Sequence, residues 1–161
     1  MVVIAMGVPG AGKTTVACQL ARELGWDFLD ADSFHSSASV AKMQAGIPLD
    51  DADRAPWLKL LRREIERAID ENRNLALACS ALKRSYREQL MVSAEVKLVY
   101  LKGSFEVLRQ RLAHRTGHFM TEQLLASQLE TLEEPSDAIT VDVQRSVPDI
   151  IAEILRQLRL R

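Results

Sequence analysis

The stretch GVPGAGKT at residues 7–14 fits the pattern G-x-x-x-x-G-K-[ST]. An apolar run of strand length that is rich in β-branched residues, at residues 1–6, comes directly before it. After it, apolar side chains recur at helical spacing from Val16 to Leu24, and Gly25 offers a C-terminal stop. A strand, a glycine-rich loop and a helix in this order predict a phosphate-binding loop.

The residue types of this loop suit a polyphosphate. Glycines let backbone N–H groups converge on phosphate oxygens, and the following helix points its positive end at them. Lys13 can reach the outer phosphates, and the Thr14 hydroxyl is placed to ligate Mg²⁺. The alternatives are a chance glycine-rich turn and a loop that no longer binds nucleotide. The expected nucleotide-binding residues are Gly7, Val8, Pro9, Gly10, Ala11, Gly12, Lys13, Thr14 and Thr15.

Composition narrows the class of protein. The chain has 161 residues, 47% of them apolar, so we expect a single domain with a sizeable core over residues 1–161. Its 21 basic and 22 acidic residues nearly balance, which argues against a nucleic-acid partner. No apolar run approaches transmembrane length and no signal peptide is visible, so we expect a cytoplasmic protein with no membrane partner.

The two cysteines predict no special chemistry. Cys18 and Cys79 fit neither a disulfide framework nor a paired metal-ligand spacing. Cys18 falls in the first expected helix, and Cys79 ends an apolar run. We therefore expect both to be buried as small apolar side chains.

Strand and helix patterns alternate along the rest of the chain. Four more strands are expected at residues 26–30, 75–79, 96–101 and 139–143. Helices are expected at residues 39–45, from Pro56 to 69, and at 84–92, 105–112, 121–133 and 148–158, with Asp53 or Ala55 near the cap of the second of these. The strands are almost continuously apolar, as a sheet covered on both faces requires. The fold class is therefore α/β, with a five-stranded parallel sheet flanked by helices around a P-loop.

Two carboxylates follow the second expected strand. Asp30 and Asp32 come just past its end, where ligands bind in an open α/β sheet. One of them could hold Mg²⁺ through water, and the other could accept a proton from an attacking hydroxyl group. Turn formation is the alternative interpretation, because Asp favours such positions in any case.

A basic cluster near residue 115 predicts a lid. Arg111 and Arg115 precede Gly117, so a mobile segment could bring positive charge to a transferring phosphate. The alternative is a helix C-terminus decorated with cations that suit its dipole. The paired aspartates and this cluster favour a kinase over a GTPase switch, whose guanine motif the sequence lacks, and over a non-catalytic nucleotide-binding module.

Two further segments support a narrower assignment. They are Asp-Arg-x-Pro-Trp-Leu at residues 53–58 and Cys-Ser-Ala-Leu-Lys at residues 79–83. With them the chain resembles the bacterial-type gluconate kinases, within the group of enzymes similar to shikimate and nucleoside-monophosphate kinases. Matching segments run nearly from end to end, at residues 6–14, 28–35, 42–49, 51–58, 79–87, 100–103, 115–119, 128–135 and 141–142.

The resemblance implies a reaction and its participants. It implies Mg²⁺-dependent transfer of a phosphoryl group from ATP to D-gluconate, giving 6-phosphogluconate, and a homodimer as found for many of these enzymes. It also implies that Asp30 lies near Mg²⁺ and its waters, that Asp32 is the base for the acceptor hydroxyl, and that adenine packs near the loop after Val143. A lid is expected over about residues 111–120. The catalytic candidates are Lys13, Asp32, Arg111 and Arg115.

The acceptor is expected to bind to a segment at about residues 33–57. A gluconate carboxylate requires a cation, preferably a guanidinium, and the candidates are Arg54, Lys83 and Arg87, each with a structural ion pair as the alternative. His35 and Lys42 could frame the polyol, together with Trp57, which suits the core equally well. The expected substrate-binding residues are Asp32, His35, Lys42, Arg54, Lys83 and Arg87.

The acceptor segment departs from the family pattern after His35. Ser36, Ser39 and Val40 stand at or near positions where the family usually has Pro, and then Asn before an Ile. A kinase of another small hydroxy acid, similar to shikimate kinase, is therefore an alternative to a gluconate kinase.

Overall fold

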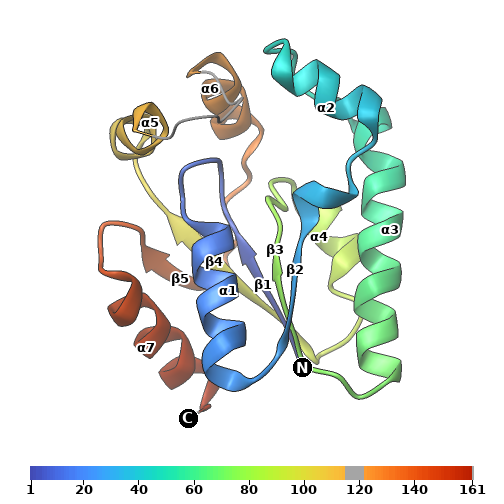
Figure 1. The fold of residues 1–161 in the computed structure, drawn as a ribbon, viewed down its shortest axis with the longest axis vertical. Helices are drawn as coiled ribbons and strands as arrows, with labels where there is room; N and C mark the ends of the chain where they lie inside the picture. Colours follow the sequence, from blue (N-terminus) through green and yellow to red (C-terminus); the bar gives the residue numbers. More distant parts are fainter. Residues whose placement is uncertain (115–121, 161) are drawn as a thin grey trace.

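Five parallel strands form one sheet in the order β2-β3-β1-β4-β5 (Figure 1). The computed structural model describes residues 1–114 and 122–160. The strands are β1 (Val2–Met6), β2 (Asp27–Asp30), β3 (Leu75–Ala78), β4 (Val96–Lys102) and β5 (Ile139–Asp142). This arrangement confirms the α/β fold class that was predicted from the alternating strand and helix patterns.

Helices cover both faces of this sheet. In Figure 1, α1 and α7 lie side by side over one face, and α3 with α4 covers the other. The helices are α1 (Lys13–Leu24), α2 (Ser37–Gln44), α3 (Asp51–Asp70), α4 (Arg84–Leu90), α5 (Phe105–Ala113), α6 (Glu122–Thr131) and α7 (Val147–Leu158), with a 3₁₀ turn at Ala31–Phe34. None of the helices within the described residues combines the length and apolar character that crossing a membrane requires.

The central strand β1 is buried on both sides. Ile4 packs against residues of α3 such as Leu61, whereas Val3 packs in a second cluster with Leu20 of α1 and Ile151 of α7. Successive side chains of a strand point to opposite faces, so both clusters follow from one apolar run. The phosphate-binding loop is therefore anchored at the carboxyl end of the central strand, which is buried along its whole length.

Helix α3 begins at Asp51, earlier than the sequence pattern predicted. The Asp50 side chain accepts from the Asp53 N–H at 2.7 Å, and the Asp53 side chain accepts from the Asp50 N–H at 3.1 Å. This reciprocal capping box satisfies two N–H groups that a helix start otherwise leaves unpaired. Pro56 therefore lies inside the helix, and its missing N–H leaves out one hydrogen bond of the helix interior.

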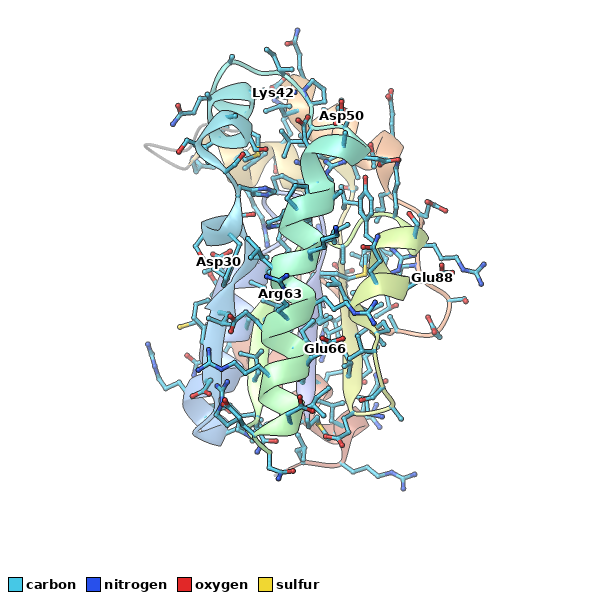
Figure 2. All side chains as sticks on the ribbon, turned by 90° about the vertical axis from the view of Figure 1, so that its right-hand side faces the viewer. Asp30, Lys42, Asp50, Arg63, Glu66 and Glu88 are labelled. Atoms are coloured by element: carbon cyan, nitrogen blue, oxygen red, sulfur yellow. The ribbon has the colours of Figure 1, made fainter. Side chains whose placement is uncertain are left out.

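The outward face of α3 is charged. Figure 2 shows Arg63 and Glu66 on this face, and Arg62 is bonded to Glu66 at 2.8 Å one turn along the helix. An exposed pair at this spacing contributes a few tenths of a kcal/mol. These charges form the solvated face of the helix.

The burial of the two cysteines differs. Cys79 is buried, and burial raises the pKa of its thiol to about 12, so it is an inert core residue. Cys18 is only partly buried, which corrects the expectation that both would lie in the core. The helical spacing did place Cys18 in α1, but at the border of its buried face.

Candidate active site

The phosphate-binding loop connects β1 to α1, in the context that the sequence predicted. Gly10 and Gly12 have φ angles of 85° and 92°, which only glycine adopts readily. A Cβ atom on Gly10 would lie 3.0 Å from the carbonyl oxygen of Leu108 in α5. The glycines therefore let the loop turn left-handed and lie directly against α5.

Lys13 and Thr14 open α1 immediately after this loop. The Lys13 Nζ donates to the carbonyl oxygen of Gly7 at 3.0 Å, so the lysine folds back over the loop. The Thr14 hydroxyl donates to Asp30 Oδ2 at 3.0 Å, and Asp30 Oδ1 accepts from the backbone N–H of Asp32 at 3.0 Å. Asp30 thus links the end of the loop to the carboxyl end of β2.

The Thr14 and Asp30 oxygens form a donor set that suits Mg²⁺. Within the described residues there is no group of three or more His, Cys, Asp or Glu side chains that could hold a metal. Mg²⁺ in phosphoryl-transfer sites takes only one or two protein oxygens, the others coming from water and phosphate. A hydroxyl and a carboxylate 3.0 Å apart at the end of the loop meet that requirement.

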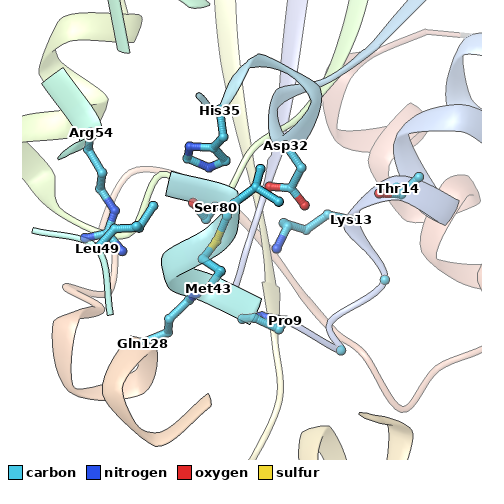
Figure 3. Close-up of a pocket in the computed structure, with 13 residues that line it drawn as sticks. Pro9, Lys13, Thr14, Asp32, His35, Met43, Leu49, Arg54, Ser80 and Gln128 are labelled. Atoms are coloured by element: carbon cyan, nitrogen blue, oxygen red, sulfur yellow. The ribbon is translucent and has the colours of Figure 1, made fainter. Parts of the chain in front are cut away.

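One cavity of about 190 Å³ brings the loop and the acceptor segment together. Figure 3 shows Lys13 and Asp32 pointing toward one another, with His35 and Arg54 farther along the wall. The residues that line it are Pro9, Gly10, Gly12, Lys13, Thr14, Asp32, His35, Val40, Met43, Leu49, Arg54, Ser80 and Gln128. Phosphate-binding groups, a carboxylate and a buried cation therefore face the same space.

His35 is held as a neutral side chain in this wall. Its ring stacks on Trp57 with 4.4 Å between ring centroids and 14° between planes, and its Nδ1 is buried without a hydrogen-bond partner among the residues that the structure describes. Burial lowers the pKa of His35, with Asp32 opposing the effect and Arg54 adding to it. Trp57 itself is a core residue, since it is 2% exposed and donates from Nε1 to the Ala31 carbonyl at 2.7 Å.

Of the three carboxylate candidates, only Arg54 lines this cavity. It is 8% exposed, and its Nη1 donates to the Tyr86 hydroxyl at 3.1 Å. Lys83 forms an ion pair with Asp51 at 2.9 Å, on the outer side of the α3 start. The ion-pair alternative therefore describes Lys83 in this structure.

Arg87 lies away from the cavity, in a structural position. Its guanidinium donates to the carbonyl oxygens of Ala81, Leu82 and Glu133 at 2.8, 3.0 and 2.8 Å. These bonds join the loop before α4 to the chain after α6. An arginine satisfied by three backbone carbonyls stabilises the fold, so the geometry does not support its predicted contact with substrate.

Lys42 also has a protein partner. Its Nζ donates to both carboxylate oxygens of Asp53, at 3.0 and 2.9 Å, and this bond raises the pKa of Lys42. Asp53 belongs to the capping box of α3, so this pair fastens α2 to the start of α3. Figure 2 shows Lys42 near Asp50 at this helix start. Lys42 thus lies within the acceptor segment but is not among the described residues that line the cavity.

Arg111 lies on the other side of the loop. It donates to the carbonyl oxygens of Gly10 and Val143, and it lines a second cavity of about 410 Å³ with Thr15 and Val143. This is the place where the resemblance predicted adenine packing. Arg115 and the rest of the predicted lid, residues 115–120, lie outside the described residues.

The sequence prediction missed several residues that line the main cavity. Ser80 follows the carboxyl end of β3, a position that the general rule for parallel sheets could have indicated. Met43 and Leu49 pack with Leu124 of α6, and Gln128 of the same helix reaches the cavity. No local pattern could have found these contacts, because they depend on how the acceptor segment docks onto a distant helix.

Comparisons with known proteins identify the family of this chain. The chain matches the protein family described as an AAA domain over residues 2–135. A gluconokinase from Gluconobacter oxydans is 44% identical, covering 97% of this chain and 90% of its own length. A probable gluconokinase from Xenopus tropicalis is 42% identical, covering 96% of this chain and 91% of its own length.

A solved structure extends the similarity to three dimensions. The crystal structure of a gluconokinase from Sinorhizobium meliloti matches with a TM-score of 0.85 and 42% identity, covering 98% of this chain and 90% of that one. The sequence similarity therefore extends over at least 90% of each of these proteins, and the similarity of fold over 90% of the Sinorhizobium chain. The chain belongs to the gluconokinase family.

Proposed function

We propose that this chain transfers the γ-phosphoryl group of ATP to D-gluconate, giving 6-phosphogluconate. The observation that carries the proposal is the single cavity in which Lys13, Asp32 and Arg54 face the same space. A phosphate-binding lysine, a carboxylate and a buried cation are the groups required by a donor phosphate, an acceptor hydroxyl and an acceptor carboxylate. The names of the similar proteins support the same choice of acceptor.

ATP is expected to span the two cavities beside the loop. The backbone N–H groups of residues 7–12 and the start of α1 would bind the outer phosphates, with Lys13 as a point charge. The base would occupy the cavity lined by Thr15, Arg111 and Val143. Arg111 would therefore lie between base and phosphates, where a cation could neutralise charge that develops during transfer.

Thr14 and, through water, Asp30 would hold Mg²⁺. When bound there, the ion neutralises charge on the phosphates. The protein contribution is the hydrogen bond between Thr14 and Asp30, which fixes both oxygens before any ligand arrives. Preorganisation of this kind lowers the cost of ordering the site on binding.

The transfer itself exchanges two bonds to phosphorus. The bond between the γ-phosphorus and its bridging oxygen breaks, a bond to the acceptor oxygen forms, and the acceptor proton passes to the Asp32 carboxylate. The backbone of Asp32 is fixed by its hydrogen bond to Asp30, so its side chain is aimed from a rigid turn. Arg115 is proposed to join Arg111 at the transferring group.

The acceptor is proposed to lie between Asp32 and Arg54. The Arg54 guanidinium would bind the carboxylate, and the neutral His35 ring would lie along the polyol. Lys42 and Lys83 would act on the acceptor indirectly. Their ion pairs with Asp53 and Asp51 would hold the start of α3 in position. The same cation also suits another small hydroxy acid, which is the second candidate class.

An acceptor panel separates these candidates. ADP formation from Mg-ATP is measured with D-gluconate, shikimate, nucleoside monophosphates and no acceptor. We expect turnover with gluconate alone. Turnover with another acid would overturn the acceptor and keep the kinase, whereas ATP binding without turnover on any acceptor would support a non-catalytic module.

Three features outside the reaction are also proposed, from the composition of the chain and from the family resemblance. We expect one domain over residues 1–161 with a lid at about residues 111–120, a cytoplasmic location and a homodimer. Light scattering coupled to size-exclusion chromatography tests the dimer directly, because it gives the mass of the particle in solution.

A further inference from the structure

Arg54 has an unusual environment for an arginine. It is 8% exposed, and among the described residues its guanidinium has one hydrogen-bond partner, the Tyr86 hydroxyl at 3.1 Å. A guanidinium carries five N–H groups, so most of them are left for a ligand in the cavity that Arg54 lines. A long side chain such as that of arginine binds a ligand well only if neighbouring groups restrict its conformations beforehand, because ordering it on binding costs entropy.

Tyr86 contacts the guanidinium in two ways. Besides the hydrogen bond to its hydroxyl, the Arg54 Cζ lies 5.5 Å from the centroid of the Tyr86 ring. The ring itself is fixed, because Tyr86 is 3% exposed and belongs to the core cluster of α3 and α4. A hydrogen bond and a ring contact from one rigid residue restrict both the position and the orientation of the guanidinium.

The Tyr86 hydroxyl has a defined direction. It donates a hydrogen bond to Asp51 Oδ1, and Lys83 Nζ donates to the same oxygen at 2.9 Å. The bonds from Tyr86 and Lys83 lower the pKa of Asp51, so this carboxylate is ionised, and burial raises the pKa of Tyr86. The single phenolic proton therefore points to Asp51, and the lone pairs of the oxygen face Arg54.

The fold brings these four groups together from two helices. Asp51 and Arg54 lie one turn apart at the start of α3, and Lys83 and Tyr86 lie at the start of α4. Neighbouring residues along a helix at this spacing share a face. The cluster therefore couples the two helix starts and leaves Arg54 at its inner end, against the cavity.

We propose that Tyr86 is a positioning residue for the acceptor: its hydroxyl holds the Arg54 guanidinium so that the remaining N–H groups face the carboxylate of the sugar acid. Asp51 and Lys83 complete the arrangement by fixing the direction of that hydroxyl. This inference rests on the proposed function, because it takes the carboxylate of the acceptor as the ligand of Arg54.

The test is Tyr86→Phe, which keeps the ring contact and removes the hydrogen bond. The KM for gluconate rises about tenfold, because a misplaced guanidinium binds the carboxylate less well in ground state and transition state alike. The kcat and the KM for Mg-ATP change less than about twofold, since the phosphate-binding loop is untouched. Tyr100→Phe is the matched control: it removes a buried hydroxyl elsewhere in the core and leaves the KM for gluconate unchanged.

A double-mutant cycle shows whether Tyr86 acts through Arg54. In the background of Arg54→Ala, adding Tyr86→Phe changes kcat/KM for gluconate by less than about twofold, because the group it positions is gone. Thermal melting of each variant accompanies the kinetics and identifies any loss of folded protein. Independent, multiplicative effects of the two substitutions would overturn the inference.

The arms of this experiment separate its two possible failures. If the wild-type protein does not phosphorylate gluconate, the proposed function falls and the inference falls with it. If the wild-type protein does and Tyr86→Phe leaves the KM for gluconate unchanged, only the inference is overturned. If Arg54→Ala itself leaves that KM unchanged, Arg54 is not the carboxylate ligand and the positioning role of Tyr86 is likewise refuted.

Discussion

Asp32 is the residue on which the proposed chemistry depends most directly. Asp32→Asn keeps the size of the side chain and removes its ability to accept a proton, so kcat falls by about 10² to 10⁴ while the affinity for ATP changes little. A turnover assay measures kcat, and titration with nucleotide measures the affinity for ATP. Asp70→Asn, at the exposed end of α3, is the control. A kcat close to the wild-type value for Asp32→Asn would remove Asp32 from the role of base.

His35 makes the stability depend on pH. Its pKa is lowered in the folded state, chiefly by burial, so the unfolded chain binds more protons between that lowered pKa and the ordinary value of 6.5. The free energy of unfolding is therefore unaffected by His35 titration above this pH window, and it falls as the pH is lowered through the window. Urea titrations at pH 7.5 and 5.5 should show a smaller loss for His35→Gln than for the wild type. Equal losses would mean that His35 does not titrate in this way.

At the scale of elements, the start of α3 joins stability to acceptor binding. Asp50→Ala removes the side chain that caps this helix, so the free energy of unfolding should fall by about 1 kcal/mol. Because the same turn carries Arg54, the KM for gluconate should rise as well. Ser146→Ala, which removes the cap of α7, should cost similar stability and leave that KM unchanged. Equal KM values for gluconate in the two variants would show that the capping of α3 does not affect acceptor binding.

The elements were predictable where one local pattern determined them. The glycine spacing and Lys13 predicted the loop. The apolar run before it predicted β1, because a strand that is buried on both faces has a nearly continuous apolar sequence. The predicted start of α3 was wrong because Pro56 is typical of the first turn of a helix, whereas the Asp50–Asp53 capping box begins this helix earlier. The sequence prediction assigned Arg87 to the substrate site because a cation is apparent from the sequence alone. The three carbonyl oxygens that accept its hydrogen bonds come together only in the folded chain.

At the scale of the whole molecule, ligand binding should stabilise the fold through mass action. ATP at about 100 times its Kd adds about 2.7 kcal/mol to the free energy of unfolding, if it binds only the folded state. We expect thermal melting with ATP to shift upward more with Mg²⁺ than with EDTA, and Thr14→Val to remove most of that difference. A Thr14→Val protein that still responds fully to Mg²⁺ would place the ion elsewhere.

The most direct test of the account is the position of the new phosphate on the product. In the proposed arrangement the phosphoryl group is transferred at the end of the cavity with Lys13 and Asp32, and Arg54 lies at the other end. A carboxylate bound to Arg54 would therefore present the far end of the sugar acid to ATP. Phosphorus and carbon NMR of the product formed from gluconate and Mg-ATP should place the phosphate on O6. A phosphate on a carbon next to the carboxylate, or no phosphorylated product, would contradict the account.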